Sequence, residues 1–232
     1  LPAARRVFVY IRTGTNGYLF RGAETTDFDD RIKRLADKLA DTPIRNIWVS
    51  VDSFDSQVHE RMRGLPGVVR GIEKALPIFA ERGLYLSANL GINRNLAGSV
   101  AGGEELSYEF FRQAFDRFYR YVTELGFSIA NVCYPMWSGP EQSDSDAVYA
   151  ATSSDQITCF SGTEKLALFR ALLETIPKHR RSIRIFTPRA SLHALLNQYQ
   201  GDDELTSPCR GGLDFFFVDS KDGNTYDCGS GG

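Results

Sequence analysis

Short polar side chains follow three successive apolar, β-rich segments of the chain, at the point where each segment ends. Hydroxyl and amide groups gathered in this way, together with backbone N–H groups, suit a ligand that carries ribose and amino-acid groups. The alternative is that each side chain caps the helix or turn that follows it. The residues are Thr15 and Asn16 with Gly17, then Ser50 and Asp52, then Ser87 and Asn89.

Two cysteines near the C-terminus form a second candidate set. Cys209 and Cys228 flank a segment whose Asp222-Gly223 pair predicts the turn of a β-hairpin. Thiolates on adjacent hairpin strands can share a metal ion or an iron–sulfur cluster, so both are candidate metal ligands. A disulfide across the hairpin and two buried thiols are the alternatives. Two cysteines alone do not complete a four-thiolate site.

The other nucleophiles and bases form no recognisable catalytic motif. His59 follows a strand end and could act as a base, but a surface histidine beside Glu60 is the commoner situation. His179 lies at a predicted helix end, where a cation interacts favourably with the helix dipole. Cys133 lies inside an apolar run and is interpreted as a core thiol. The sequence shows no serine–histidine–aspartate order, no phosphate-binding glycine loop and no HExxH helix.

The elements that must position these residues alternate between strands and helices. Apolar β-rich runs predict strands, and apolar residues at helical spacing predict helices. Such alternation indicates a parallel sheet covered by helices, because parallel strands need crossover connections. The predicted strands are 7–12, 47–51, 84–90, 127–134 and 183–186, and the predicted helices are 27–39, 66–81, 107–125, 163–176 and 191–199.

At least four consecutive βα units indicate a barrel-like sheet, whose chemistry lies at the carboxyl ends of the strands. We therefore predict an α/β fold in which residues 1–200 form a partial (β/α) barrel with parallel strands. Residues 201–232 are expected to form a small C-terminal β-hairpin module. The polar segment 138–161 is longer than a plain connector, so substrate contacts are expected there.

Composition excludes several classes of protein. The 232 residues are 42% hydrophobic and 24% charged, with a formal net charge of −2, which argues against a generally basic nucleic-acid surface. No apolar stretch approaches a membrane span or a secretory signal, so we expect a cytoplasmic protein with no nucleic-acid or membrane partner. Four cysteines are too few for a disulfide scaffold. The start at Leu1 indicates a piece of a longer protein or a processed product.

Several short motifs, in order, resemble those of radical S-adenosylmethionine enzymes. The segment 48–55 (WVSVDSFD), followed by 59–64 (HERMRG), is similar to that family's strand ending in Ser-x-Asp and the loop with His and then Arg-Gly. The turn 15–17 resembles the Thr-Asn-Gly that ends the third barrel strand, and Asn89 matches a polar residue of the fifth strand. The segment 209–228 is similar to the opening of an auxiliary-cluster extension called SPASM or twitch.

This resemblance implies reductive cleavage of S-adenosylmethionine by a [4Fe–4S] cluster. The resulting 5′-deoxyadenosyl radical would abstract hydrogen from a peptide or small-molecule substrate, and a flavodoxin or ferredoxin would supply electrons. The resemblance also assigns individual residues. Thr15, Asn16 and Ser50 would contact the cofactor, Asn89 would contact its ribose, Arg63 would pair with a carboxylate, and Cys209 and Cys228 would ligate the auxiliary cluster.

The chain departs from this family in lacking the Cys-x3-Cys-x2-Cys loop and the Gly-Gly-Glu strand. Compared with the family, it begins just before the third strand, so the chain alone is expected to be inactive. A second hypothesis is a barrel-derived binding or interaction protein that has lost the radical cluster. A third is a (β/α) hydrolase or lyase with its site at the strand ends, for which no convincing nucleophile or acid–base pair is present.

Overall fold

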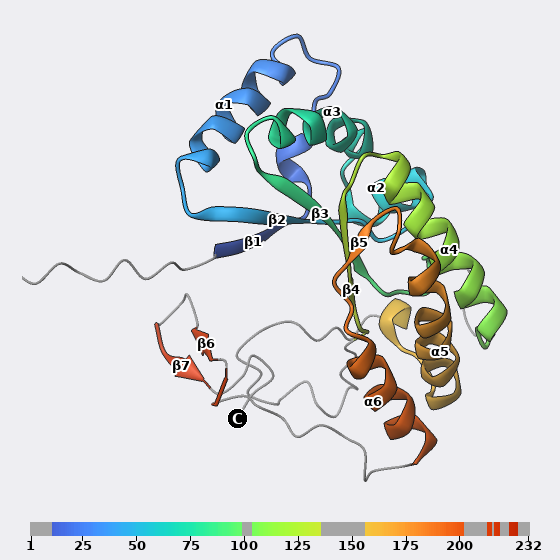
Figure 1. Ribbon diagram of the computed structural model, residues 1–232. Coiled ribbons are helices and arrows are strands. Elements are labelled where there is room, and N and C mark those ends of the chain that lie inside the picture. Colours follow the sequence, from blue (N-terminus) through green and yellow to red (C-terminus); the bar gives the residue numbers. More distant parts are fainter. Residues whose placement is uncertain are drawn as a thin grey trace, which may run out of the picture.

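The computed structural model describes residues 11–98, 104–135, 156–201, 213–214, 216–218 and 223–226. Within them, five strands form one parallel sheet in the order β1-β2-β3-β4-β5 (Figure 1). The predicted α/β class, a partial barrel with parallel strands, is confirmed. The strands are β1 (Ile11–Thr15), β2 (Ile44–Ser50), β3 (Tyr85–Gly91), β4 (Ile129–Cys133) and β5 (Arg184–Ile185).

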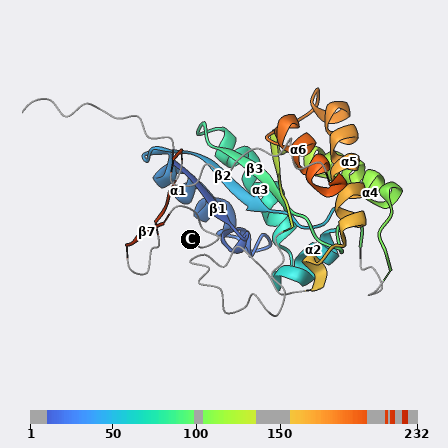
Figure 2. The ribbon, with the colours of Figure 1, turned by 90° about the horizontal axis from the view of Figure 1, so that it is seen from below.

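Helices and short 3-10 turns connect these strands. Figures 1 and 2 both show α4, α5 and α6 grouped at the β4–β5 end of the sheet, while α1 and α3 lie near β1 to β3. In chain order they are η1 (Tyr18–Phe20), α1 (Phe28–Ala40), α2 (Ser56–Arg63), α3 (Val68–Ala80), α4 (Tyr108–Glu124), η3 (Gln156–Thr158), α5 (Gly162–His179) and α6 (Arg189–Gln200).

Side-chain alternation divides the sheet into two faces. One face is packed under the helices, and its residues Val49, Ala88, Leu90 and Ala130 are fully buried. The alternate residues of each strand point to the opposite side of the sheet, which we call the inner face. Its residues are Asn46, Trp48 and Ser50 on β2, Tyr85, Ser87, Asn89 and Gly91 on β3, and Ile129, Asn131 and Cys133 on β4.

The sheet is strongly curved towards its inner face. In a flat sheet, β1 and β5 would be four intervals of about 4.8 Å apart, or roughly 19 Å. Instead, the Arg12 guanidinium of β1 lies 5.5 Å from the ring centroid of Phe186, the residue that follows β5. The two outermost strands are therefore brought close enough for side-chain contact, which is the geometry of a partial barrel.

Local sequence explains α2, a short helix that the apolar pattern does not predict. Asp55 caps its start by accepting hydrogen bonds from Gln57 N and Val58 N at 2.9 and 3.2 Å. It ends at Gly64, whose φ of 63° lies in the left-handed region that favours glycine. Glu60 in turn accepts hydrogen bonds from the backbone N–H groups of Gly67, the N-cap of α3, and of Val69. Helix α3 begins only at residue 68, two residues later than predicted.

A two-stranded antiparallel pair, β6 (Phe217–Val218) with β7 (Thr225–Tyr226), lies where the C-terminal hairpin is predicted. Cys209, Cys228 and most of the predicted loop 138–161 lie outside the described residues, and the domain boundary at 200/201 stays a prediction. Among the described helices, none has the length and apolar character needed to cross a membrane.

The packing of α3 against η1 yields a stability prediction. A Cβ atom on Gly71 would lie 1.7 Å from the Phe20 carbonyl oxygen, a contact that no side-chain rotation can relieve. Gly71→Ala should therefore lower the free energy of unfolding by about 3 kcal/mol or more, measured by urea denaturation. Gly162→Ala is the control, because a Cβ there meets nothing within 4 Å and should change stability by less than about 1 kcal/mol. Equal effects of the two substitutions would contradict the prediction.

Candidate functional site

Polar side chains gather on the inner face where β2, β3 and β4 end. The strand register places Ser50 beside Asn89 and Asn89 beside Asn131, so that these three residues form one row. One step further along the strands, Gly91 lies beside Cys133. The row is partly exposed and Cys133 is exposed. The carboxyl ends of parallel strands are also where (β/α) folds place their binding sites.

Hydrogen bonds fix the orientation of the amide at the centre of the row. Asn89 Oδ1 accepts a hydrogen bond from Asn131 Nδ2 at 2.9 Å and another from Cys133 Sγ at 3.3 Å. Because the oxygen faces β4, the Asn89 Nδ2 group is turned away from that strand. The row thus presents amide donors and acceptors in a defined order.

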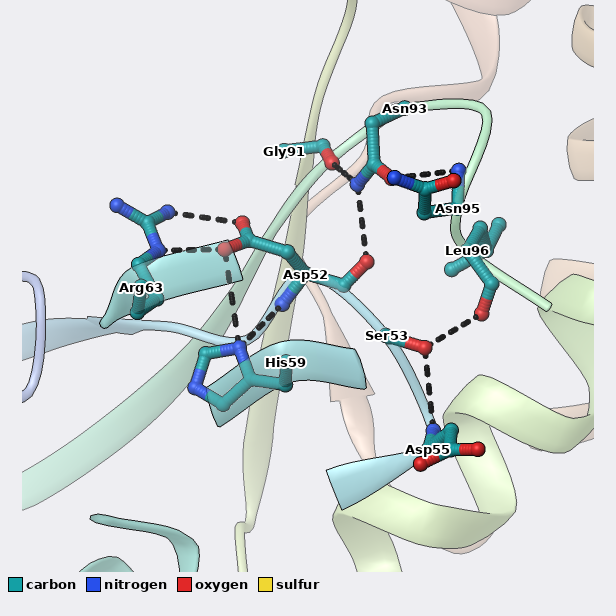
Figure 3. A network of polar contacts seen from close by, with 9 residues as sticks. All are labelled: Asp52, Ser53, Asp55, His59, Arg63, Gly91, Asn93, Asn95 and Leu96. Atoms are coloured by element: carbon teal, nitrogen blue, oxygen red, sulfur yellow. Dashed lines mark hydrogen bonds and ion pairs between the residues drawn. The ribbon is translucent and has the colours of Figure 1, made fainter. Parts of the chain in front are cut away.

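An ion pair with a buried carboxylate lies at the edge of this row (Figure 3). Asp52, only 4% exposed, accepts two parallel hydrogen bonds from Arg63, with Nε–Oδ2 at 2.5 Å and Nη2–Oδ1 at 2.8 Å. The carboxylate lies close to Gly91 of β3, since a Cβ on Gly91 would be in van der Waals contact with Asp52 Oδ1 at 3.4 Å. The two-pronged geometry fixes both side chains and joins the end of α2 to the segment that follows β2.

His59 is completely buried and contacts Asp52. Its Nδ1 accepts a hydrogen bond from the backbone N–H of Asp52 at 3.2 Å, which places the ring proton on Nε2. Nδ1 is also 3.7 Å from Asp52 Oδ2. Within the described part of the chain, Nε2 has no hydrogen-bond partner. The interpretation of His59 as a surface side chain is therefore wrong.

The pKa of Asp52 reflects these contacts. Burial acts to raise the pKa of Asp52, but the polar contact with His59 and the hydrogen bonds and positive charge of Arg63 together outweigh burial. The Asp52 pKa is held below its ordinary value. The carboxyl is thus ionised at neutral pH, which suits it to hold Arg63 and does not suit it to donate a proton.

Further hydrogen bonds tie the segment after β2 to the segment after β3 (Figure 3). Asn93 Nδ2 donates to the carbonyl oxygens of Asp52 and Gly91 at 2.9 and 2.8 Å. Ser53 Oγ donates to Leu96 O at 3.1 Å. These bonds satisfy buried backbone groups and hold two adjacent strand ends in a fixed relation.

The structure brings together some of the residues predicted from the sequence and separates others. Ser50 and Asn89 lie side by side on the inner face. Thr15 is in register with Val49, so it lies on the helix-covered face and not on the inner face. Its Oγ1 accepts a hydrogen bond from the backbone N–H of Gly17 at 3.1 Å. Asn16 accepts a bond from Tyr18 N in the same turn. The predicted cofactor contacts of these residues, and of Arg63, stay predictions.

Asn131, Cys133 and Asn93 complete the site but were not predicted as parts of it. Cys133 was interpreted as a core thiol, and this is wrong because its side chain is exposed. The alternation of side chains along a strand could have predicted the position of Cys133. Cys133 is two residues from the polar Asn131, so the two share a face. Within the described ranges, no group of three or more His, Cys, Asp or Glu side chains could hold a metal ion.

Comparison with known proteins identifies no family for this chain. No family model matches it, and no curated protein matches it in sequence. Among solved structures, it is similar to a sugar phosphate isomerase/epimerase from Parabacteroides distasonis, with 10% identity and a TM-score of 0.32 over 86% of this chain and 73% of that chain.

These findings overturn the resemblance to radical S-adenosylmethionine enzymes. No family model and no curated protein supports the radical-enzyme family. The described residues also offer no metal cluster. The expectations of an iron–sulfur radical enzyme, of hydrogen abstraction and of a SPASM or twitch module are therefore wrong.

The Asp52–Arg63 pair yields a prediction that depends on pH. Asp52→Asn should lower the free energy of unfolding by about 2 kcal/mol at pH 7, because it weakens the two charge-assisted hydrogen bonds that the buried carboxylate accepts from Arg63. Since the folded pKa is depressed, this advantage of the wild type is fully present above the pKa of an unfolded aspartate, about pH 4. It is lost as the pH falls through the lower folded pKa. Urea denaturation of both proteins between pH 7 and pH 2 measures the difference.

Asp37→Asn is the matched control for this experiment. Asp37 also pairs with an arginine, Arg82, at 2.5 Å, but its side chain is 61% exposed. Solvent screens such a pair, so the loss should stay below about 1 kcal/mol. An Asp52→Asn loss no larger than that of the control would show that the buried pair does not stabilise the strand ends.

Proposed function

We propose that the inner face binds a small polyhydroxylated molecule of monosaccharide size at the ends of β2, β3 and β4. The observation that carries the proposal is the hydrogen-bonded group of Asn89, Asn131 and Cys133 beside Ser50. Amide and hydroxyl groups each donate and accept hydrogen bonds, as do the hydroxyl groups of a sugar. A few oriented polar groups on a concave face are typical of small-molecule sites.

Aromatic side chains on the same face support a ring-shaped ligand. Trp48 lies two residues before Ser50, shares its face and is partly exposed. Phe186 is 36% exposed, and its backbone N–H donates to Ala130 O, which places it level with Asn131. The ring of Trp48 offers apolar contact area to the C–H groups of a sugar while its hydroxyls meet the amides, whereas Arg12 and Arg184 already lie against the ring of Phe186.

The buried network around Asp52 supports the proposal by fixing the strand ends before a ligand arrives. Asn93 bonds to the backbone after both β2 and β3, and Arg63 joins α2 to Asp52. A site whose groups are already held in place loses less conformational freedom on binding. Asp52 and Arg63 are therefore positioning residues, while Asn89 and Asn131 are the proposed ligand contacts.

The proposal predicts which substitutions weaken sugar binding. NMR titration with D-glucose, D-xylose and D-ribose should reveal saturable binding of at least one of them. Asn89→Ala and Asn131→Ala should each weaken that binding by about five- to tenfold, the value of a hydrogen bond of roughly 1 kcal/mol. Asn197→Ala on α6 is the control, since it removes an amide away from the inner face and should leave the affinity unchanged. If no sugar binds, or if all three variants bind like the wild type, the proposal is wrong.

The exposed thiol gives an independent test of where the ligand lies. Iodoacetamide should alkylate Cys133, which is exposed, faster than Cys159, which is partly buried. A saturating concentration of the bound sugar should slow alkylation of Cys133 and leave the rate at Cys159 unchanged. Peptide mass spectrometry resolves the two sites. Unchanged alkylation of Cys133 in the presence of a bound sugar would place the ligand elsewhere.

A further inference from the structure

A second candidate site lies on the other side of the sheet, between α5, α6 and the end of β5. A cavity of about 160 Å³ is present there, with walls formed by Leu173, Ile176, Pro177 and Leu192. These residues belong to the helices, so the cavity is separate from the amide row of the inner face. Its walls are apolar, which suits a compact hydrocarbon group.

One buried polar side chain of this cavity lacks a partner. Thr187 lines the cavity and is only 2% exposed, and its Oγ1 has no hydrogen-bond partner among the described residues. Thr187 follows buried Ile185 by two residues, so strand alternation directs it to the same helix-covered side. A buried hydroxyl without a partner is unfavourable, and a ligand with a polar end would supply that partner.

Positive charge surrounds the same polar end. The twelve-residue helix α6 begins beside Thr187, its N-cap is Pro188, and neither a side-chain cap nor an acidic residue is present in its first turn. Arg180 and Arg189 line the cavity, and Arg180 Nη2 donates to Thr187 O at 3.3 Å. No acidic side chain is among the described lining residues. A helix N-terminus and two guanidinium groups together favour an anion.

We propose that this cavity binds a small monocarboxylate with a compact apolar body. The carboxylate would meet Thr187 Oγ1, the guanidinium groups of Arg180 and Arg189, and the start of α6. The apolar body would lie against Leu173 and Leu192. An apolar cavity of about 150 Å³ holds a benzene ring, so the volume here fits a carboxylate of the size of benzoate. The proposal does not depend on sugar binding at the inner face.

A titration of the full chain with benzoate, followed by amide NMR, tests the proposal. Saturable shifts are expected at the amides of Thr187, Arg189 and Leu192. Benzyl alcohol, which has the same ring without the charge, should bind at least about tenfold more weakly. The variant Arg189→Gln should weaken benzoate binding by about tenfold, and Thr187→Val by a few fold. Arg189 is exposed, so its variant tests the charge even if Thr187→Val does not fold.

Arg181→Gln is the matched control, because Arg181 is an exposed arginine next to Arg180 that does not line this cavity. It should leave benzoate affinity unchanged, as should Asn131→Ala on the inner face. Three results would overturn the proposal. They are the absence of saturable shifts at the three amides, equal binding of benzyl alcohol and benzoate, and an equal loss of affinity in Arg181→Gln and Arg189→Gln.

Discussion

The burial of one carboxylate constrains the arrangement of the strand ends. A charged group removed from water must be paired and hydrogen-bonded, or it will neutralise by a shift of its pKa. Asp52 meets this requirement with the two bonds from Arg63, and its backbone N–H finds its acceptor in His59. His59 and Arg63 both lie on α2, so these contacts fix the position of that helix relative to the end of β2. The end of β3, which carries part of the amide row, is tied to this arrangement because Asn93 Nδ2 donates to the carbonyl oxygens of both Asp52 and Gly91.

The same alternation of side chains produces both the core and the candidate site. On β3, Ala88 and Leu90 are fully buried under the helices, while Asn89 points to the inner face. Curvature then makes that second face concave, as the Arg12–Phe186 contact between the outermost strands shows. A sequence that builds a helix-covered partial barrel therefore leaves an inner face whose residues packing does not dictate. Amides and hydroxyls occupy it here, and this is the physical basis for expecting ligand binding.

Apolar spacing was enough to predict the alternation of strands and long helices, because elements such as α3, α4 and α5 each bury a regular stripe of side chains. It was also enough to place Ser50 and Asn89 together, since neighbouring parallel strands end at the same edge. The network around Asp52 was not predictable in this way. In α2 only Val58 and His59 are buried, so the helix has no apolar stripe, and its stability comes from the Asp55 cap and from tertiary bonds. Burial of His59 follows from those bonds, which sequence spacing does not reveal.

The motif that suggested a radical enzyme has a local physical explanation. In the segment 50–64, Asp52 pairs with Arg63, His59 accepts from the Asp52 backbone, and Gly64 ends α2 with a positive φ of 63°. Most of the residues that carry the resemblance are thus needed to connect a strand to a short helix around a buried charge. That connection alone accounts for these residues in this chain. Its presence therefore indicates the connection and does not by itself indicate a cofactor, which is why the proposed ligand sites rest on Asn89 with Asn131 and on Thr187 instead.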